Sequence, residues 1–216
     1  MDKMKNSRQY IIWFLVSLAV FMLSVFLHEC GHGIANSIAG IPCSTGFNRV
    51  GDIYKFPSAD DFRSYYGTTE PVLLDFGVPC TLVLSLTGAV LYARSKNRKL
   101  QYLGASLACG NSLLRLVPCL MVLLVPLATG SAHIEDEYET GQLLVERLGS
   151  GIWLYVPAVF SVIAAVSSLT IVFVAALKRK ISRPYVYVIL AFLVFCTGMV
   201  LASVLDRYVR INWPGM

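Results

Sequence analysis

Charged residues are scarce in this chain of 216 residues: Asp, Glu, Lys and Arg together make up 14% of it, whereas hydrophobic residues make up 56%. A soluble domain carries about 25% charged residues. The deficit indicates that much of the surface faces something other than water. The composition therefore favours a membrane protein over a soluble one.

The recurring motifs of several other protein classes are also absent. None of the six cysteines forms a C-x-x-C pair, so a cysteine zinc site or a redox dithiol is not expected. No G-x-S-x-G, Walker-type or dinucleotide-binding motif occurs. The net charge of +5 does not indicate a nucleic-acid partner, because the basic residues form short runs between apolar segments. The sequence leaves a Cys43–Cys80 disulfide open.

Five stretches are long and apolar enough to span a lipid bilayer, which takes about 20 residues. Within lipid they must be helical, because no water is present to satisfy backbone polar groups. We therefore predict an all-α fold, a polytopic membrane helical bundle of about five transmembrane helices, in which Pro118 and Pro126 kink or break the third. The spans are residues 10–27, continuing as a helix towards Ala39, and residues 71–93, 100–128, 151–177 and 185–205.

The loops between these spans differ in charge. Residues 3–8, 94–99 and 178–183 are basic, whereas the loop at 135–146 is acidic. Basic loops remain in the cytoplasm, which predicts a multi-pass plasma-membrane protein with a cytoplasmic N-terminus and an external C-terminus. Residues 40–70 mix glycines with aromatic residues and are expected to form a short hairpin or loop at the membrane interface.

Three ionisable residues at the end of the first span form an H-E-x-x-H motif: His28, Glu29 and His32. Positions four apart share one helix face, so His28 and His32 can direct two nitrogens at one metal ion. Glu29 follows the first ligand, where it can act as general base. Such groups cost about 2.5–3.5 kcal/mol each on an apolar helix, and a bound cation compensates them. The motif predicts a Zn²⁺ site with Glu29 as the catalytic residue.

A catalytic zinc ion takes three protein ligands and keeps one position open. Asp75, Asp136 and Asp206 are carboxylate candidates for the third ligand, with Glu135 beside Asp136 as a further option. His133 would complete a three-histidine site. All three aspartates are expected near the same membrane face, so the predicted topology leaves the choice open.

The third span carries a polar pair on one helix face, Asn111 and Arg115. An arginine inside a span needs a partner, and we expect Arg115 to hold helices together by pairing with Asp75 or Glu70, in preference to contacting substrate. Asn111 is the candidate substrate-binding residue, since its amide can donate to a scissile peptide. A purely structural role for Asn111 is equally consistent with the sequence.

The motif resembles the signature of the site-2 protease family of intramembrane metallopeptidases, H-E-x-G-H at the end of a first apolar helix; residues 28–33 read H-E-C-G-H-G here. Residues 77–79 (Gly-Val-Pro) are similar to that family's Gly-Pro element. Residues 111–118 resemble the stretch of Asn and Pro that precedes its third ligand. The resemblance covers about residues 21–139. The family's Leu-Asp-Gly is absent, and residues 135–138 (Glu-Asp-Glu-Tyr) stand in its place.

This resemblance implies a three-helix catalytic core that holds zinc through two His and one Asp, and chain order then favours Asp136. Residues 1–139 would form the core, with residues 140–216 adding two helices packed on it as one structural unit. The implied activity is hydrolysis of a peptide bond in or near a transmembrane segment of a membrane-protein or peptide substrate. The alternative is a zinc-binding membrane scaffold, chaperone or transporter without peptidase activity.

Overall fold

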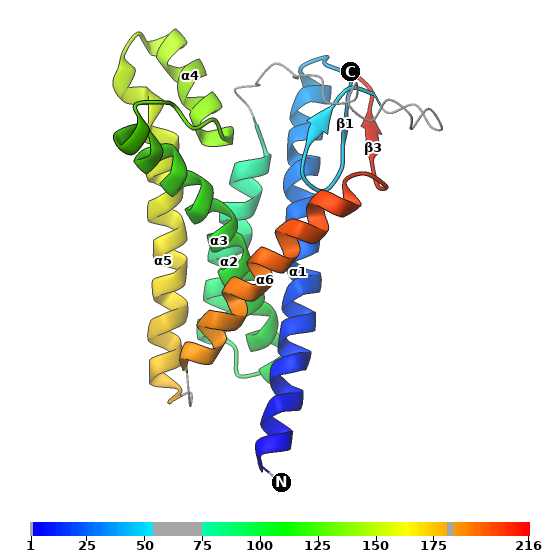
Figure 1. The fold of residues 1–216 in the computed structure, drawn as a ribbon, viewed down its shortest axis with the longest axis vertical. Helices are drawn as coiled ribbons and strands as arrows, with labels where there is room; N and C mark the ends of the chain where they lie inside the picture. The colour runs from blue at the N-terminus through cyan, green and yellow to red at the C-terminus, as the bar shows by residue number, and fades with distance from the viewer. Residues whose placement is uncertain (1, 54–74, 181–183) are drawn as a thin grey trace.

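The computed structural model of the protein describes residues 2–53, 75–180 and 184–216, and these residues confirm the predicted all-α bundle (Figure 1). Short strands and one 3-10 helix accompany the six α-helices of the described part. The elements are α1 (Asp2–Ile38), β1 (Cys43–Thr45), β2 (Val50–Gly51), α2 (Gly77–Arg94), α3 (Arg98–Thr129), α4 (Asp136–Leu148), η2 (Gly151–Leu154), α5 (Val156–Lys178), α6 (Pro184–Leu205) and β3 (Ile211–Trp213).

Five of these helices, α1, α2, α3, α5 and α6, are long and apolar enough to cross a membrane, which marks the chain as a membrane protein. They correspond to the five spans expected from hydropathy. Pro118 and Pro126 both lie inside α3, yet neither ends the helix. A proline removes one backbone donor, and helices inside a membrane tolerate that loss where neighbouring helices and side chains satisfy the freed groups.

The acidic loop expected after the third span is in fact a helix, α4. Its first turn carries Asp136, Glu137 and Glu139, and acidic side chains stabilise the positive end of the helix dipole. Gly149 ends α4 with a left-handed backbone, φ 71°, the conformation that glycine adopts at helix C-termini without a Cβ penalty. Amphipathic α4 lies at one end of the bundle, beside the C-terminal end of α3 (Figure 1).

The helices pack through small and hydroxyl-bearing residues, as is usual where lipid removes the hydrophobic drive between helices. A Cβ on Gly88 would lie 2.6 Å from the backbone nitrogen of Ala108, so α2 and α3 approach very closely. The hydroxyl of Ser85 on α2 lies 2.7 Å from that of Ser112 on α3 and 2.8 Å from that of Ser168 on α5. These contacts hold α2, α3 and α5 as one group.

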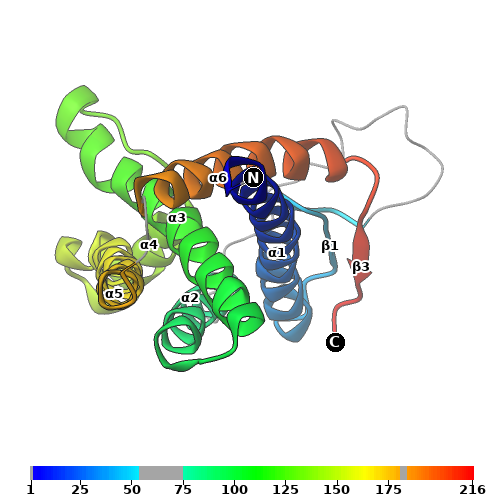
Figure 2. The same ribbon diagram turned by 90° about the horizontal axis from the view of Figure 1, so that it is seen from below.

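Helix α6 lies across α1 and α3, as the view from below shows (Figure 2). The crossing point is Phe21 of α1, whose ring fits against Gly198 of α6: a Cβ there would lie 2.2 Å from the ring. Phe21 is fully buried, and the cluster around it joins all three helices. The two C-terminal spans therefore pack on the first three from different sides, α5 on α2 and α3, and α6 on α1 and α3.

The short hairpin expected in residues 40–70 is present in residues 43–51. Residues 54–70 of that predicted segment lie outside the described part of the chain. Strands β1 and β2 pair antiparallel, with Ser44 opposite Gly51. The C-terminal strand β3 pairs with the other edge of β1, which gives the order β2-β1-β3. Cys43 and Cys80 are both free thiols, so the disulfide left open by the sequence is not formed.

Candidate metal centre

Two imidazole rings from the C-terminal part of α1 and one carboxylate from the start of α4 meet at one end of the bundle. The Nε2 atoms of His28 and His32 on α1 lie 3.1 Å apart. Asp136, the first residue of α4, places Oδ2 3.1 Å from Nε2 of His28 and 3.7 Å from Nε2 of His32. Among the described residues these three form a group able to hold a metal ion. The helical spacing brings the two histidines together, and the start of α4 brings the aspartate.

The dimensions of this triangle fit zinc. Tetrahedral zinc with bonds of about 2.0–2.2 Å to nitrogen and carboxylate oxygen sets its ligand atoms about 3.3–3.5 Å apart. The three separations observed here, 3.1, 3.1 and 3.7 Å, lie around that value. Two nitrogens and one carboxylate oxygen also form the donor set of catalytic rather than structural zinc sites, which leave one position open.

Asp75 is not the third member of the triangle, but it contacts the other ring nitrogen of His32. Its Oδ1 lies 2.8 Å from Nδ1 of His32, the ring nitrogen that faces away from His28. It also accepts a hydrogen bond from the backbone N–H of Gly77 (2.9 Å), which holds the carboxylate in place. A carboxylate on the outer nitrogen keeps the proton there and leaves Nε2 with its lone pair free to bind a cation.

Asp75→Asn is expected to weaken zinc binding by about 10–100-fold, the usual effect of losing such a supporting partner. The amide cannot hold the Nδ1 proton of His32 as strongly as the carboxylate does. Competition against a zinc-selective indicator measures the affinity. Asp52→Asn is the matched control, because it removes the same charge from an exposed position and should leave the affinity unchanged. Equal affinity in both variants would contradict this role for Asp75.

Two glycines allow α2 to begin directly against the histidines. A Cβ on Gly77 would lie 2.7 Å from Nε2 of His32 and 2.9 Å from Nδ1 of His28. A Cβ on Gly31 would lie 2.6 Å from the backbone nitrogen of Gly77. Any larger side chain at either position would displace the imidazoles or separate α1 from α2. The glycines in both sequence motifs thus serve this one close contact.

Glu29, the candidate general base, is buried beside the triangle. It is 7% exposed, and its carboxylate interacts electrostatically with His28, His32 and Asp136. It forms no hydrogen bond or ion pair with another residue of the described part. Glu29 therefore lies close enough to the triangle to interact with it, and no hydrogen bond or ion pair with a described residue assigns it a packing role.

Arg115 contacts the site, and its partners differ from those expected. Its Nη1 donates to Oδ2 of Asp136 (2.9 Å) and lies 3.4 Å from Oε1 of Glu137, while Nη2 lies 3.4 Å from Nε2 of His28. The expected pairing with Asp75 is wrong, because His32 occupies that carboxylate; the other expected partner, Glu70, lies outside the described residues. Arg115 ties the first turn of α4 to α3 and so positions Asp136.

The surroundings of Asp136 keep it ionised. Burial raises the pKa of this carboxyl, but His32, the hydrogen bond with His28 and the Arg115 guanidinium together hold the pKa well below its usual range. A metal-binding carboxylate must be deprotonated, and this shift of the Asp136 pKa favours that form.

The remaining candidate ligands have other partners. Oδ1 of Asp206 accepts the backbone N–H groups of Phe47 (2.9 Å) and Asn48 (3.0 Å), and the same carboxylate pairs with Arg210, so it organises the hairpin. Glu135 and His133 pair with each other at 3.0 Å. Of the carboxylates considered from the sequence, Asp136 is therefore the one that lies beside both Nε2 atoms.

Asn111, the candidate substrate contact, is fully buried one turn before Arg115 on α3. Its amide nitrogen donates to Oγ of Ser24 (3.1 Å) and to the carbonyl of Leu107 (2.9 Å). Its Oδ1 has no hydrogen-bond partner in the described part of the chain. Asn111 thus links α3 to α1 next to the site, and its contact with a substrate stays a prediction.

Glu137 was not singled out from the sequence, although it is buried and shares Arg115 with Asp136. Its position in an acidic run is typical of a solvated loop, and only the helical form of α4 turns it inward.

No family model, no curated protein and no solved structure matches this chain. The resemblance to the site-2 protease family therefore rests on the motifs in residues 28–33, 77–79 and 111–118.

Proposed function

We propose that the protein is an intramembrane zinc metallopeptidase that hydrolyses peptide bonds in or near a transmembrane segment of a membrane-protein or peptide substrate. One observation carries the proposal: His28, His32 and Asp136 present three ligand atoms at tetrahedral zinc spacing beside the buried carboxylate of Glu29. The first span carries His28, Glu29 and His32, and Asp136 comes from the first turn of α4.

The roles of the side chains follow from their positions. His28 and His32 would bind zinc through Nε2 and Asp136 through Oδ2, while Asp75 and Arg115 hold two of these ligands in place. The ion, when bound, supplies a Lewis acid for the attacking water and the scissile carbonyl. Glu29 accepts the proton of that water and later delivers it to the leaving amine.

The depth of the site bears on where a substrate would be cut. His32 is six residues before the end of α1 at Ile38, which is about 9 Å along a helix, so cleavage is expected near a membrane surface. A helical substrate hides its carbonyls and must unwind to react. Because β1 is already paired on both edges, an unwound segment would add to an outer strand, β2 or β3.

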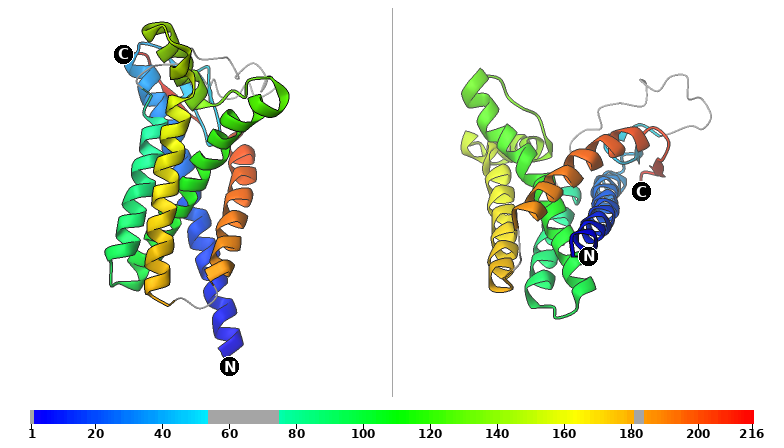
Figure 3. Two further views of the ribbon diagram at one scale, coloured as in Figure 1. Left: turned by 90° about the vertical axis from the view of Figure 1, so that its left-hand side faces the viewer. Right: turned by 60° about the horizontal axis from the view of Figure 1, so that its bottom comes forward.

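We further infer that the site opens towards the outer face of the plasma membrane. The N-terminus lies at the end of the bundle opposite to α4 and the C-terminus (Figure 3). The turn between α2 and α3 and the end of α5, both basic, lie at the N-terminal end as well. The preference of basic loops for the cytoplasm supports this orientation.

Metal removal tests the proposal. Protein purified in detergent is expected to carry about one zinc ion per chain, the content of a site of this kind, and to cleave labelled single-span peptides in liposomes. A chelator should abolish cleavage, and one equivalent of zinc should restore it, because every proposed step takes place at the metal. Zinc is counted by elemental mass spectrometry and cleavage by peptide mass spectrometry. Metal-free protein that still cleaves would rule out the proposed mechanism.

A zinc-binding membrane scaffold, chaperone or transporter without peptidase activity is the second candidate. Arg115 favours it, since its Nη1 donates to the same Oδ2 of Asp136 that would bind zinc. A guanidinium so close partly neutralises the carboxylate that would bind the ion and adds a tie between α3 and α4, which suits a stabilising role better than a catalytic one. Both candidates require bound zinc, so they differ in what the loss of Glu29 does.

A further inference from the structure

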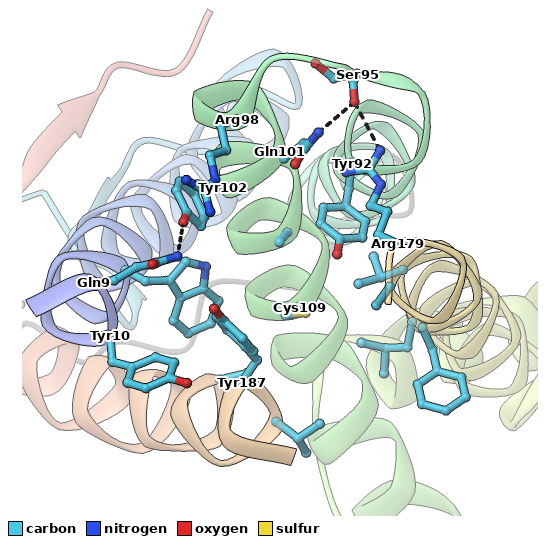
Figure 4. A pocket seen from close by; sticks show the side chains of 18 of the residues that line it. Gln9, Tyr10, Tyr92, Ser95, Arg98, Gln101, Tyr102, Cys109, Arg179 and Tyr187 are labelled. Atoms are coloured by element: carbon cyan, nitrogen blue, oxygen red, sulfur yellow. Dashed lines mark hydrogen bonds between the residues drawn. The ribbon is translucent and has the colours of Figure 1, made fainter. Parts of the chain in front are cut away.

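A cavity lies towards the opposite end of the bundle from the metal centre. Its volume is about 990 Å³, and its walls come from α1, α3, α5, α6 and the end of α2 (Figure 4). Trp13 lines it on α1, and His28 follows 15 residues later, about 22 Å along the helix. This end of the cavity is therefore far from the metal centre, while its inner end reaches Leu113 on α3, two positions before Arg115.

The mouth of this cavity is positively charged. Lys96, Arg98 and Arg179 line it, and its described lining contains no Asp or Glu. Nη2 of Arg179 donates to the carbonyls of Ala93 (3.1 Å) and Ser95 (3.0 Å), while its buried Nη1 has no hydrogen-bond partner in the described part of the chain. Within the described lining these cations have no acidic partner, and the Arg179 guanidinium, which lies 4.8 Å from the centroid of the Tyr92 ring, keeps one buried donor unsatisfied.

Aromatic side chains stand beside the cations. The ring of Tyr187 on α6 packs edge-on against those of Tyr10 and Trp13 on α1, each at a centroid distance of 5.6 Å. All three line the cavity, and Figure 4 labels Tyr10 and Tyr187. Trp and Tyr in membrane proteins gather at the level of the lipid headgroups. The mouth of the cavity is therefore at the boundary between lipid and water.

The inner part of the cavity is apolar. Leu169, Phe173 and Phe192 line it from α5 and α6. Leu169 and the C-cap residue of α5, Arg179, are ten residues apart, which is about 15 Å along a helix. One leaflet of a bilayer has a hydrocarbon depth of about 15 Å. The cavity thus continues from a cationic mouth into a hydrophobic channel as deep as one leaflet.

We propose that this cavity binds one anionic phospholipid, with its phosphate against Lys96, Arg98 and Arg179 and an acyl chain along the apolar walls of α5 and α6. A basic pocket between membrane helices matches the charge of such a headgroup. A free anion would make no use of the apolar channel, and a zwitterionic lipid would not neutralise three cations. The site is independent of the metal centre and of any peptidase activity.

Binding is tested on the full-length protein in detergent with phosphatidylglycerol and phosphatidylcholine of identical acyl chains, counted by native mass spectrometry. Each cation near a lipid surface contributes about fivefold in affinity, so K96Q/R98Q should lower phosphatidylglycerol binding by about 25-fold. R94Q/K99Q removes the same charge from the same turn outside the cavity lining and should change binding less than about twofold. Equal losses in the two variants would overturn the proposal.

A filling variant separates the cavity from its charged mouth. Ala191 lines the apolar part on α6, and Ala191→Phe should abolish phosphatidylglycerol binding while every cation remains. Val200→Phe, on an exposed position of the same helix, should have no effect. Wild-type binding by Ala191→Phe, no preference of the wild type for phosphatidylglycerol, or full displacement of the lipid by millimolar inorganic phosphate would each overturn the proposal. Unchanged helicity and elution volume establish that the variants are folded.

Discussion

Glu29→Gln is expected to leave zinc bound and to lower peptide cleavage by at least about 100-fold, the smaller end of the usual contribution of a general base. Glutamine has almost the same shape, but its amide cannot accept a proton from water. None of the three atoms at zinc spacing belongs to Glu29, so the metal should stay. The measurements are zinc content per chain and the initial rate on a single-span peptide that the wild type cleaves.

The control for this variant is Glu146→Gln, the same chemical change on an exposed position of α4, which should cleave at the wild-type rate. Cleavage that persists in Glu29→Gln would show that another group takes the proton. Loss of zinc from Glu29→Gln would mean that Glu29 binds or stabilises the metal itself. A transport activity that survives the substitution, with no cleavage by the wild type, would support the transporter alternative instead.

The second large effect is expected at the third ligand. Asp136→Asn should weaken zinc binding by more than about 100-fold, beyond the range seen for partners that only orient a ligand. The substitution removes the negative charge that would offset the cation and that now pairs with Arg115 at 2.9 Å. Cleavage should fall with zinc content and should return only at high zinc concentration. The affinity is measured by competition, at constant pH, against a zinc-selective indicator.

Glu135→Gln provides the matched control, because Glu135 is the preceding acid and bonds His133 rather than the metal centre. Asp136→Asn also leaves Arg115 with only Glu137 as an acidic partner in the described structure, so it could act by loosening α4. Asp136→Cys distinguishes the two effects: a thiolate of similar size binds zinc but is a poor hydrogen-bond partner for a guanidinium. Recovery of zinc by Asp136→Cys would support direct ligation, and equal zinc loss in Glu135→Gln and Asp136→Asn would contradict it.

The sequence alone was sufficient for the bundle and for two of the three residues of the candidate metal site. A run of about 20 apolar residues is long enough to cross the bilayer, and its backbone must be helical there because lipid offers no hydrogen-bond partners. Hydropathy therefore located the five helices. The four-residue spacing places His28 and His32 on the same face of α1, and their Nε2 atoms lie 3.1 Å apart. Glycine at position 31 was also visible in the motif, although its contact with Gly77 was not.

Only the tertiary structure decided which acid completes the triangle. Asp136 lies 108 positions from His28 along the chain, and no local pattern relates residues so distant. Asp75, Asp136 and Asp206 were equivalent by predicted topology, because each was expected near the same membrane face, and only the chain order implied by the family resemblance favoured Asp136. The packing of the helices gives each aspartate a different partner. The start of α2 places Asp75 against Nδ1 of His32, and Arg115 on α3 holds Asp136 beside the triangle. Asp206 instead accepts a hydrogen bond from the backbone of the hairpin. Short-range geometry therefore determines the two imidazoles, and the packing of distant helices determines the third ligand.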